Sequence, residues 1–141
     1  MAAWDPTSDA DVKTAVRAET QYEDNADELP DSELDTLVER AKHRVSLETG
    51  STAWFTDSGM GMVLIAYTCM RTKAAVENAS IVSYSLGDES VQLRNADPDT
   101  SQQIQQWADD VAVGLNASSA DASSRLKPRN TSGYVGETYT T

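Results

Sequence analysis

The spacing of apolar residues constrains this fold most, because it follows a helical period almost everywhere and changes only once. Apolar residues recur at intervals of three and four in four segments, which we expect to form helices. Between the third and the fourth segment the period drops to two, and two short alternating runs flank Gly87-Asp88. The pattern predicts a mainly α fold: a four-helix core with one β-hairpin, at about residues 81–94, between the third and fourth helices.

The helical segments carry local start and stop signals. We expect helices over about residues 9–20 and 60–78, a helix that follows a cap at Asp31 or Ser32 and runs to about Glu48, and a last helix that opens at Asp97-Pro98. Ser8 and Asp11 have the spacing of a capping box at the start of the first helix. Asp31 or Ser32 is the expected N-cap of the second helix. Gly50 is expected to end that helix, as a glycine in left-handed backbone commonly does.

The third helical segment is apolar on all sides around residues 62–66, which is typical of a helix buried on most of its faces. The second and fourth segments are each apolar on one face. These positions and the hairpin define an expected core: Leu34, Leu37, Val45, Leu64, Ile65, Val82, Tyr84, Ile104, Trp107 and Val111.

A two-residue loop over residues 87–88 would set the register of the hairpin. Tyr84 then lies opposite Val91, and Val82 lies opposite Leu93. Both pairs are apolar and share one face, and a four-residue loop would keep the same side chains on that face. The sequence therefore predicts that Val82 and Tyr84 point towards the core.

Composition divides the chain into an irregular arm over residues 1–7, a helical domain over residues 8–116 and an extended C-terminal tail over residues 117–141. The tail is rich in Ser, Thr, Asn and Gly, so it cannot build a core of its own. A solvated tail has no need of large apolar side chains, so we predict that this one docks on another chain. Its apolar side chains are Leu126, Tyr134, Val135 and Tyr139.

The charge of the chain is strongly acidic. It has 23 acidic and 11 basic residues, a formal net charge of −12, and its acids are spread over the whole length. This composition resembles that of proteins from halophilic archaea and their viruses, in which surface acids hold water and ions. A field directed at a basic partner is the alternative interpretation. Under either interpretation the sequence lacks the basic stripe of a DNA-groove binder.

Single cysteine and histidine residues limit the chemistry. They exclude an internal disulfide, a Cys-based zinc cluster and a multi-His metal site. Cys69 is expected to be a buried thiol and His43 a surface side chain. Gly59-Met60-Gly61 lacks the remainder of a phosphate loop, so we interpret it as a hinge or helix start. The acidic stretch 23–28 lacks EF-hand spacing, which favours a solvated loop.

We therefore expect a protein that is not an enzyme and uses no cofactor or metal. The first residues lack the pattern of a signal peptide, and no apolar run is long enough to span a membrane. The order of three helices, a hairpin and a helix also fits a winged-helix DNA-binding domain. Its recognition helix would be the third, whose apolar start is unsuited to a DNA groove.

Two stretches of the chain carry a resemblance to a known family. The first has Asp11-Val12-Lys13, then Val16-Arg17, an acidic loop and a long helix closed by Thr49-Gly50. The second is residues 83–91, Ser-Tyr-Ser-Leu-Gly-Asp-Glu-Ser-Val, which contains a Gly-Asp-x-Ser-Val hairpin. In this order and spacing, over about residues 8–115, the chain resembles the head-tail connector (adaptor) proteins of long-tailed phages and haloarchaeal tailed viruses.

The resemblance implies a structural virion protein at the head-tail junction, assembled in the host cytoplasm. Such adaptors form a ring, usually of twelve copies, below the portal protein. The ring extends the DNA channel, through which the genome passes without sequence-specific binding, and offers a platform for the next neck or tail protein. No membrane is involved. The alternatives are a halophilic winged-helix DNA-binding regulator and a non-viral interaction domain.

In the adaptor interpretation, three groups of residues are candidates for contacts. Trp54 and Phe55 are candidates for the subunit interface, because aromatic side chains are enriched at interfaces. The apolar tail residues named above are expected to dock on the portal or on a neighbouring subunit. Gly87 and Asp88 form the hairpin tip, which would touch the portal, the next ring or only water.

Overall fold

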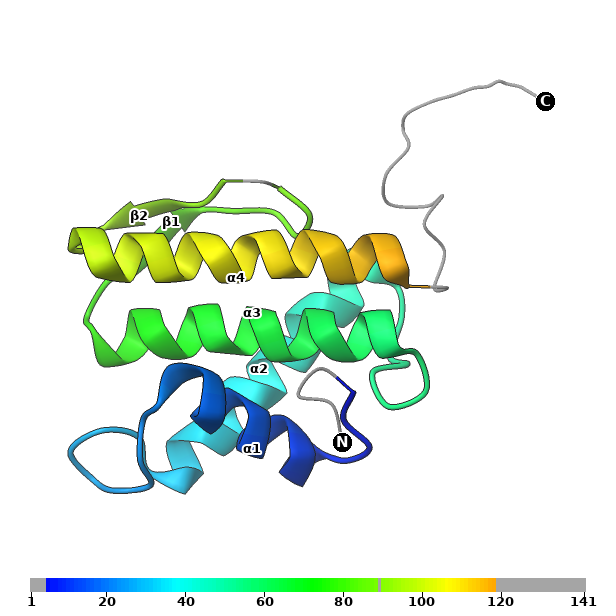
Figure 1. The fold of residues 1–141 in the computed structure, drawn as a ribbon, viewed down its shortest axis with the longest axis horizontal. Coiled ribbons are helices and arrows are strands. Elements are labelled where there is room, and N and C mark those ends of the chain that lie inside the picture. Colours follow the sequence, from blue (N-terminus) through cyan, green and yellow to red (C-terminus); the bar gives the residue numbers. More distant parts are fainter. Residues whose placement is uncertain (1–4, 89, 119–141) are drawn as a thin grey trace.

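Four helices and one antiparallel hairpin make up residues 5–88 and 90–118, the part of the chain that this computed structural model describes (Figure 1). The elements are α1 (Asp9–Thr20), α2 (Asp31–Thr49), α3 (Ser58–Val76), β1 (Ser80–Ser83), β2 (Gln92–Arg94) and α4 (Pro98–Ala117). The predicted mainly α fold, with its hairpin between the third and fourth helices, is confirmed. The expected extended tail lies outside the described residues, apart from the end of α4 and Ser118.

Helix α3 is the centre of the domain. It runs antiparallel to α4, with α1 and α2 on its other side and β1 near its C-terminal end (Figure 1). Because it is covered by three helices, almost every residue from Gly59 to Met70 is buried, including Leu64 and Ile65. The central position of this helix explains why its residues are apolar on all sides around residues 62–66.

The start of α3 is set by a cap that the sequence prediction missed. The Asp57 carboxylate accepts hydrogen bonds from the backbone N–H groups of Gly59, at 3.0 Å, and Met60, at 3.4 Å. The helix therefore begins at Ser58 rather than at Met60, and it ends at Val76 rather than at Asn78. An N-cap aspartate satisfies donors that the first helical turn leaves without partners.

The caps of the other helices agree with expectation in part. Gly50 ends α2 in left-handed backbone with φ 74°, and Asp97 caps α4. Helix α2, however, has Pro30 at its N-cap position and no side-chain cap, so the expected Asp31 or Ser32 cap is wrong. The Asp31 carboxylate instead accepts a hydrogen bond from Lys13 of α1 at 2.9 Å, so a tertiary contact replaces the local one.

The capping box of α1 differs by one residue from the expected form. Ser8 Oγ accepts from the Asp11 N–H as expected, at 3.3 Å. The Asp11 carboxylate accepts from the backbone N–H and the hydroxyl of Thr7, at 2.9 and 2.6 Å, rather than from Ser8. These hydrogen bonds lower the pKa of Asp11.

The register of the hairpin was predicted wrongly. Ile81 pairs with Leu93, where Val82 was expected, and the register shifts between Ile81 and Ser83. A shift of one residue turns each side chain to the opposite face of the strand. Val82 is consequently 51% exposed, while Ile81 and Leu93 pack on the core.

The remaining core predictions hold with two adjustments. Leu34, Val45, Leu64, Ile65, Ile104, Trp107 and Val111 are buried as expected. Leu37 and Tyr84 are only partly buried and lie at the edge of the core. The Tyr84 ring stacks on Tyr67 of α3 with 6.4 Å between ring centroids, and this contact holds the chain after β1 against the helices.

Candidate interaction surfaces

The predicted interface residues Trp54 and Phe55 have different surroundings. Trp54 is buried with 8% exposure in the core of its own chain, so it has little surface left for a neighbouring subunit. Phe55 is partly exposed, and Lys42 Nζ lies 5.8 Å from the centroid of its ring. Any contact that this loop makes with another chain therefore depends on Phe55 rather than on Trp54.

The hairpin tip folds back towards α4. Gly87 has φ 93°, and a Cβ atom placed on it would lie 3.2 Å from Leu115 Cδ1 of α4. The Asp88 N–H donates to the Ser85 carbonyl at 3.0 Å, and the Asp88 carboxylate accepts from the Ser85 N–H at 3.3 Å. The tip thus presents an exposed aspartate on a turn whose glycine lies against α4.

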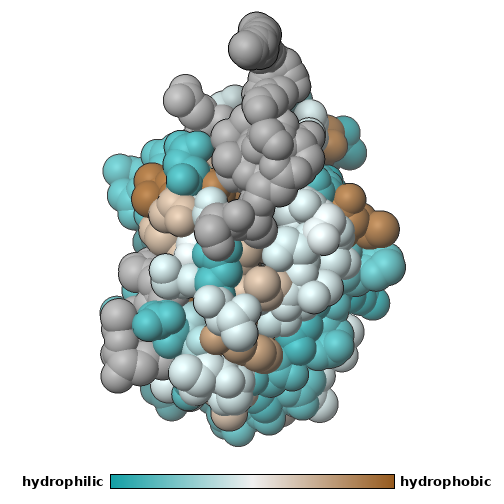
Figure 2. Space-filling model, turned by 90° about the vertical axis from the view of Figure 1, so that its right-hand side faces the viewer, coloured by the Kyte–Doolittle hydropathy of each residue, from teal (hydrophilic) through white to brown (hydrophobic). Residues whose placement is uncertain are grey.

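The predicted docking residues of the tail lie outside the described residues. Leu126, Tyr134, Val135 and Tyr139 belong to this group. The described chain stops at Ser118, whose hydroxyl donates to the Asp57 carboxylate at 2.9 Å. Ser118 therefore lies where α3 begins and α4 ends, the end of the domain that faces the viewer in Figure 2.

Exposed apolar surface is sparse on the described part of the chain. The large hydrophobic side chains that are exposed there are Leu47, Val82 and Val113. In Figure 2 the hydrophobic residues form separate spots within a mostly hydrophilic or neutral surface. A contact made by the described residues would therefore rely on polar and charged groups as much as on apolar area.

A further polar feature is a cavity that the sequence did not reveal. It lies between α2, the C-terminal half of α3 and the start of β1, with a volume of about 480 Å³. Arg40, Arg44 and Arg71 line it together with Tyr67, and four alanines and two larger aliphatic residues form its walls. No acidic residue lines it. We call this cavity the arginine socket.

Arg44 is held in place by neighbours on two elements. It pairs with Glu48 one turn along α2, and it donates to the Tyr84 carbonyl at 3.2 Å. Glu48 also accepts from the Leu86 N–H at 3.0 Å, so the pair ties α2 to the chain that follows β1. The hydrogen bond to Glu48 raises the pKa of Arg44 above its usual value.

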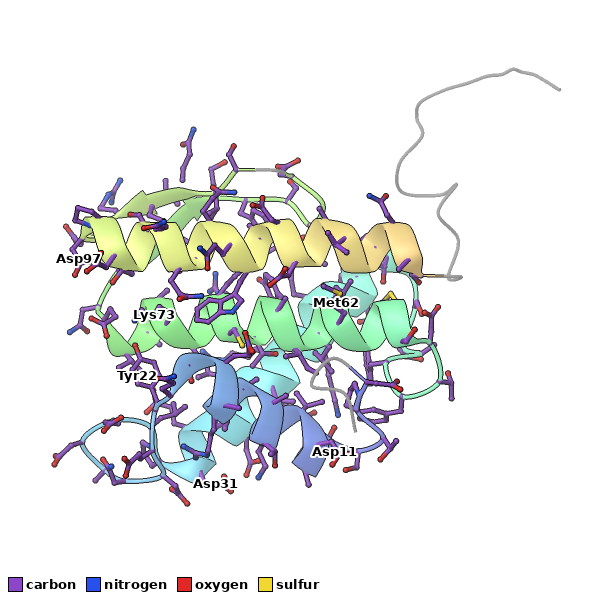
Figure 3. All side chains as sticks on the ribbon, viewed as in Figure 1. Asp11, Tyr22, Asp31, Met62, Lys73 and Asp97 are labelled. Carbon is purple, nitrogen blue, oxygen red and sulfur yellow. The ribbon has the colours of Figure 1, made fainter. Side chains whose placement is uncertain are left out.

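The acidic loop over residues 23–28 is exposed yet well ordered by its own hydrogen bonds. Asn25 Oδ1 accepts from the N–H groups of Asp27, at 2.9 Å, and Glu28, at 2.8 Å. Next to this loop, the Tyr22 hydroxyl donates to Glu77 at 2.8 Å, and the Lys73 ammonium lies 5.5 Å from the Tyr22 ring centroid (Figure 3). These contacts fix the loop beside the end of α3.

The two side chains with the most potential for catalysis or metal binding, His43 and Cys69, lie in different surroundings. His43 is exposed and Cys69 is fully buried, as predicted. Burial raises the pKa of the Cys69 thiol well above its usual value, so the thiolate is disfavoured. Within residues 5–88 and 90–118, no group of three histidine, cysteine or acidic side chains is placed to hold a metal ion.

The glycines of Gly59-Met60-Gly61 allow other parts of the chain to pack closely against the start of α3. A Cβ atom on Gly59 would lie 2.6 Å from the Gly114 carbonyl of α4, and one on Gly61 would lie 2.7 Å from Pro6. They lie in the first turn of α3 because the helix starts earlier than expected. This supports the helix-start interpretation of the motif.

Helix α3 would be the recognition helix of a winged-helix protein, but its sides face α1, α2 and α4. Its exposed residues lie at its two ends, Ser58 at the start and Arg71 and Ala75 in the C-terminal part. No helix among the described residues is long and apolar enough to cross a membrane. Comparison of the chain with protein-family models, curated proteins and solved structures finds no match.

Proposed function

We propose that this protein is a structural virion component, a head-tail adaptor that assembles into a ring below the portal protein. In this role it is not an enzyme. It extends the DNA channel and presents a platform for the next neck or tail protein. The proposal extends to the location, the head-tail junction, and to a ring of twelve copies through which DNA passes without sequence-specific contacts.

The observation that carries the proposal is the placement of the two family-like stretches on the fold. The Thr49-Gly50 ending closes α2 with a left-handed glycine, and the Gly-Asp turn belongs to the only hairpin of the described residues, between α3 and α4. Both features depend on backbone geometry that few residues adopt easily. They therefore support the resemblance more strongly than the amino-acid motifs alone do.

The charge distribution adds support for assembly. The described part of the chain offers two different charged surfaces, an exposed acidic loop beside the end of α3 and the arginine socket, which is lined by other residues. A ring requires two different, complementary patches on each subunit. The winged-helix alternative is weaker, because its recognition helix would be the most buried helix of the domain.

The tail has a part in this proposal. Tyr134, Val135 and Tyr139 would dock on the portal or a neighbour, by strand addition or by folding on binding. The same segment holds Arg125, Lys127 and Arg129, three of the 11 basic residues of the chain. A basic stretch of this kind would suit an acidic partner surface of the type found in proteins adapted to high salt.

The test is the mass of the purified protein, alone and with its cognate portal, by light scattering on a sizing column in about 2 M salt. We expect a ring-sized complex with the portal. Truncation after Ser118, which keeps the contact of Ser118 with Asp57, and the milder variant Tyr134→Ser/Tyr139→Ser should both weaken it. A monomer that ignores the portal and binds duplex DNA at low salt would favour the winged-helix alternative instead.

A further inference from the structure

The arginine socket has the composition of a site for a carboxylate. Its volume of about 480 Å³ is within the range of ligand-binding cavities, and three of its lining residues are arginines. Guanidinium groups bind carboxylates through paired hydrogen bonds. A cavity without any lining acid is notable in a chain with twice as many acidic as basic residues.

Two of the three guanidinium groups are available. Arg44 is committed to Glu48 and to the Tyr84 carbonyl, whereas Arg40 and Arg71 form no ion pair with any residue of 5–88 or 90–118. Tyr67, which is 3% exposed, lies beside them in the lining of the socket. The socket therefore offers two unpaired guanidinium groups beside an apolar wall.

The acidic loop over residues 23–28 has the complementary charge. Glu23 and Asp27 are exposed, and their carboxylates form no ion pair with the described residues. The bonds to Asn25 hold the loop in one shape, so little conformational freedom is lost when it binds. No residue of the loop lines the socket of its own chain, so a contact between the two would join different molecules.

The tail of the chain is a poorer candidate for the socket. Arg125, Lys127 and Arg129 lie within five residues of one another, and the guanidinium groups of the socket would repel them. A nucleic acid is disfavoured in turn, because its phosphate chain would extend beyond the socket and meet Asp35 and Glu39, which are exposed on the same helix as Arg40. A short acidic loop reaches the socket with the fewest such conflicts.

We propose that the arginine socket of one subunit receives the acidic loop of a second copy of this chain, with Glu23 and Asp27 facing Arg40 and Arg71. The contact uses two different surfaces, so it is heterologous and can continue from subunit to subunit until a ring closes. It rests on the proposed function, because it describes how copies of the protein would join.

The test measures self-association of the full chain by sedimentation velocity at one fixed salt concentration. Arg71→Glu reverses one charge in the socket, and Arg94→Glu makes the same change at an exposed arginine that does not line it. We expect Arg71→Glu to weaken association tenfold or more and Arg94→Glu to change it less than twofold. Asp27→Arg reverses one charge in the acidic loop and should likewise weaken association tenfold or more. Its control, Asp109→Arg on α4, should change association less than twofold.

The decisive variant combines Arg71→Glu with Asp27→Arg in one chain, because the exchanged charges attract again across the contact. Association should recover to within about threefold of the natural chain. As a second readout, a mixture of an Asp27→Cys chain and an Arg40→Cys chain, with oxidised glutathione as the oxidant, should form a disulfide between the two, whereas Asp109→Cys mixed with Arg40→Cys should not. Cys69 is fully buried and does not interfere.

The outcomes separate the two proposals. If the natural chain associates but Arg71→Glu behaves like Arg94→Glu, the socket contact is wrong and the adaptor role stands. If Arg71→Glu associates normally and fails only to bind the portal, the occupant is an acidic segment of the portal and the inference is overturned. If the natural chain stays monomeric both alone and with the portal, the adaptor role and the socket contact fall together.

Discussion

The seam between α3 and α4 and the junction between α1 and α2 are held together by different forces. At the seam, backbone meets backbone: Gly59 of α3 and Gly114 of α4 leave no room for a Cβ atom, and buried aliphatic side chains fill the rest. At the junction, Lys13 of α1 lies 2.9 Å from Asp31 and 2.8 Å from Asp35 of α2, and Arg17 lies 3.4 Å from Asp31.

The comparison shows that this acidic chain uses two of its basic side chains, Lys13 and Arg17, to join α1 to α2. The seam depends on shape and on the removal of apolar surface from water, which neither salt nor pH changes much. The junction depends on charge, so salt screening and protonation act on it directly. Substitutions that test the comparison should therefore have large effects at the seam and condition-dependent effects at the junction.

Trp107→Ala should have the largest effect on the seam. The side chain is 1% exposed, and its indole N–H lies 3.4 Å from Glu19 Oε1 of α1. We expect a loss of about 3–5 kcal/mol in the free energy of unfolding, measured by urea denaturation. Trp107→Phe keeps most of the apolar volume and should lose less. An Ala variant as stable as the natural protein would contradict the role of α4 in the core.

Gly59→Ala tests whether the seam is as tight as the structure indicates. The added Cβ would lie 2.5 Å from the backbone nitrogen of Ser118 and 2.6 Å from the Gly114 carbonyl oxygen, atoms that cannot move alone. Alanine favours a helix over glycine by about 1 kcal/mol, but the clash should outweigh this and give a net loss of about 1–3 kcal/mol. Val113→Ala, on an exposed part of α4, is the control. A stabilised Gly59→Ala variant would show that the helices are farther apart.

A third pair of substitutions tests the hairpin, which covers the core less completely than the seam does. Ile81→Thr places a hydroxyl on the face that packs on the core, and we expect a loss of about 2 kcal/mol in thermal or urea unfolding. Val82→Thr keeps the branched shape at a position that is 51% exposed, and should change stability by less than about 0.5 kcal/mol. If Val82→Thr lowered the stability more than Ile81→Thr, the register expected from the sequence would be the correct one.

The smallest effect is expected from the charges of the junction, and its sign depends on pH. The hydrogen bond from Lys13 lowers the pKa of Asp31, so the stability that this group contributes is present above its unfolded pKa and is lost as pH falls through the folded value. The hydrogen bond to Asp35 raises the pKa of Lys13, so that contribution is present below the unfolded pKa and is lost as pH rises through the folded value.

Lys13→Met should accordingly flatten the dependence of unfolding free energy on pH at both the acid and the alkaline end. The measurement is urea unfolding over the acid and alkaline ranges, with Arg94→Met as a control that removes a cation without an ion pair among the described residues. When the series is repeated at increasing salt concentration, the difference in unfolding free energy between the two variants should become smaller. Identical pH profiles for both variants would contradict the importance of the junction.

Local patterns predicted much of this molecule. The helical period located all four helices, and Gly50 and Asp97 marked an end and a start that the structure confirms. The change to an alternating period placed the hairpin between the third and fourth helices. These features depend on residues near one another in the chain, which is why periodicity and capping preferences reveal them.

The features that join distant residues were not predictable in the same way. The one-residue error in the register of Ile81 came from assuming a regular ladder, whereas the strand pair contains an irregularity that no local signal marks. The arginine socket draws residues from α2, α3 and β1, so no local pattern in the sequence groups its arginines. Trp54 was likewise indistinguishable from an interface residue, although it fills the core of its own chain.

The number and order of the helices, the strong negative charge and the burial of the third helix could be read from the amino-acid sequence, since they follow from composition and local period. The small residues that let α3 and α4 touch, the acids that pair with Lys13 and the grouping of Arg40 with Arg71 became visible only in the folded chain. Contact between two faces depends on the rotation and crossing of whole elements, and side-chain shape sets these across the core, so no single segment contains them.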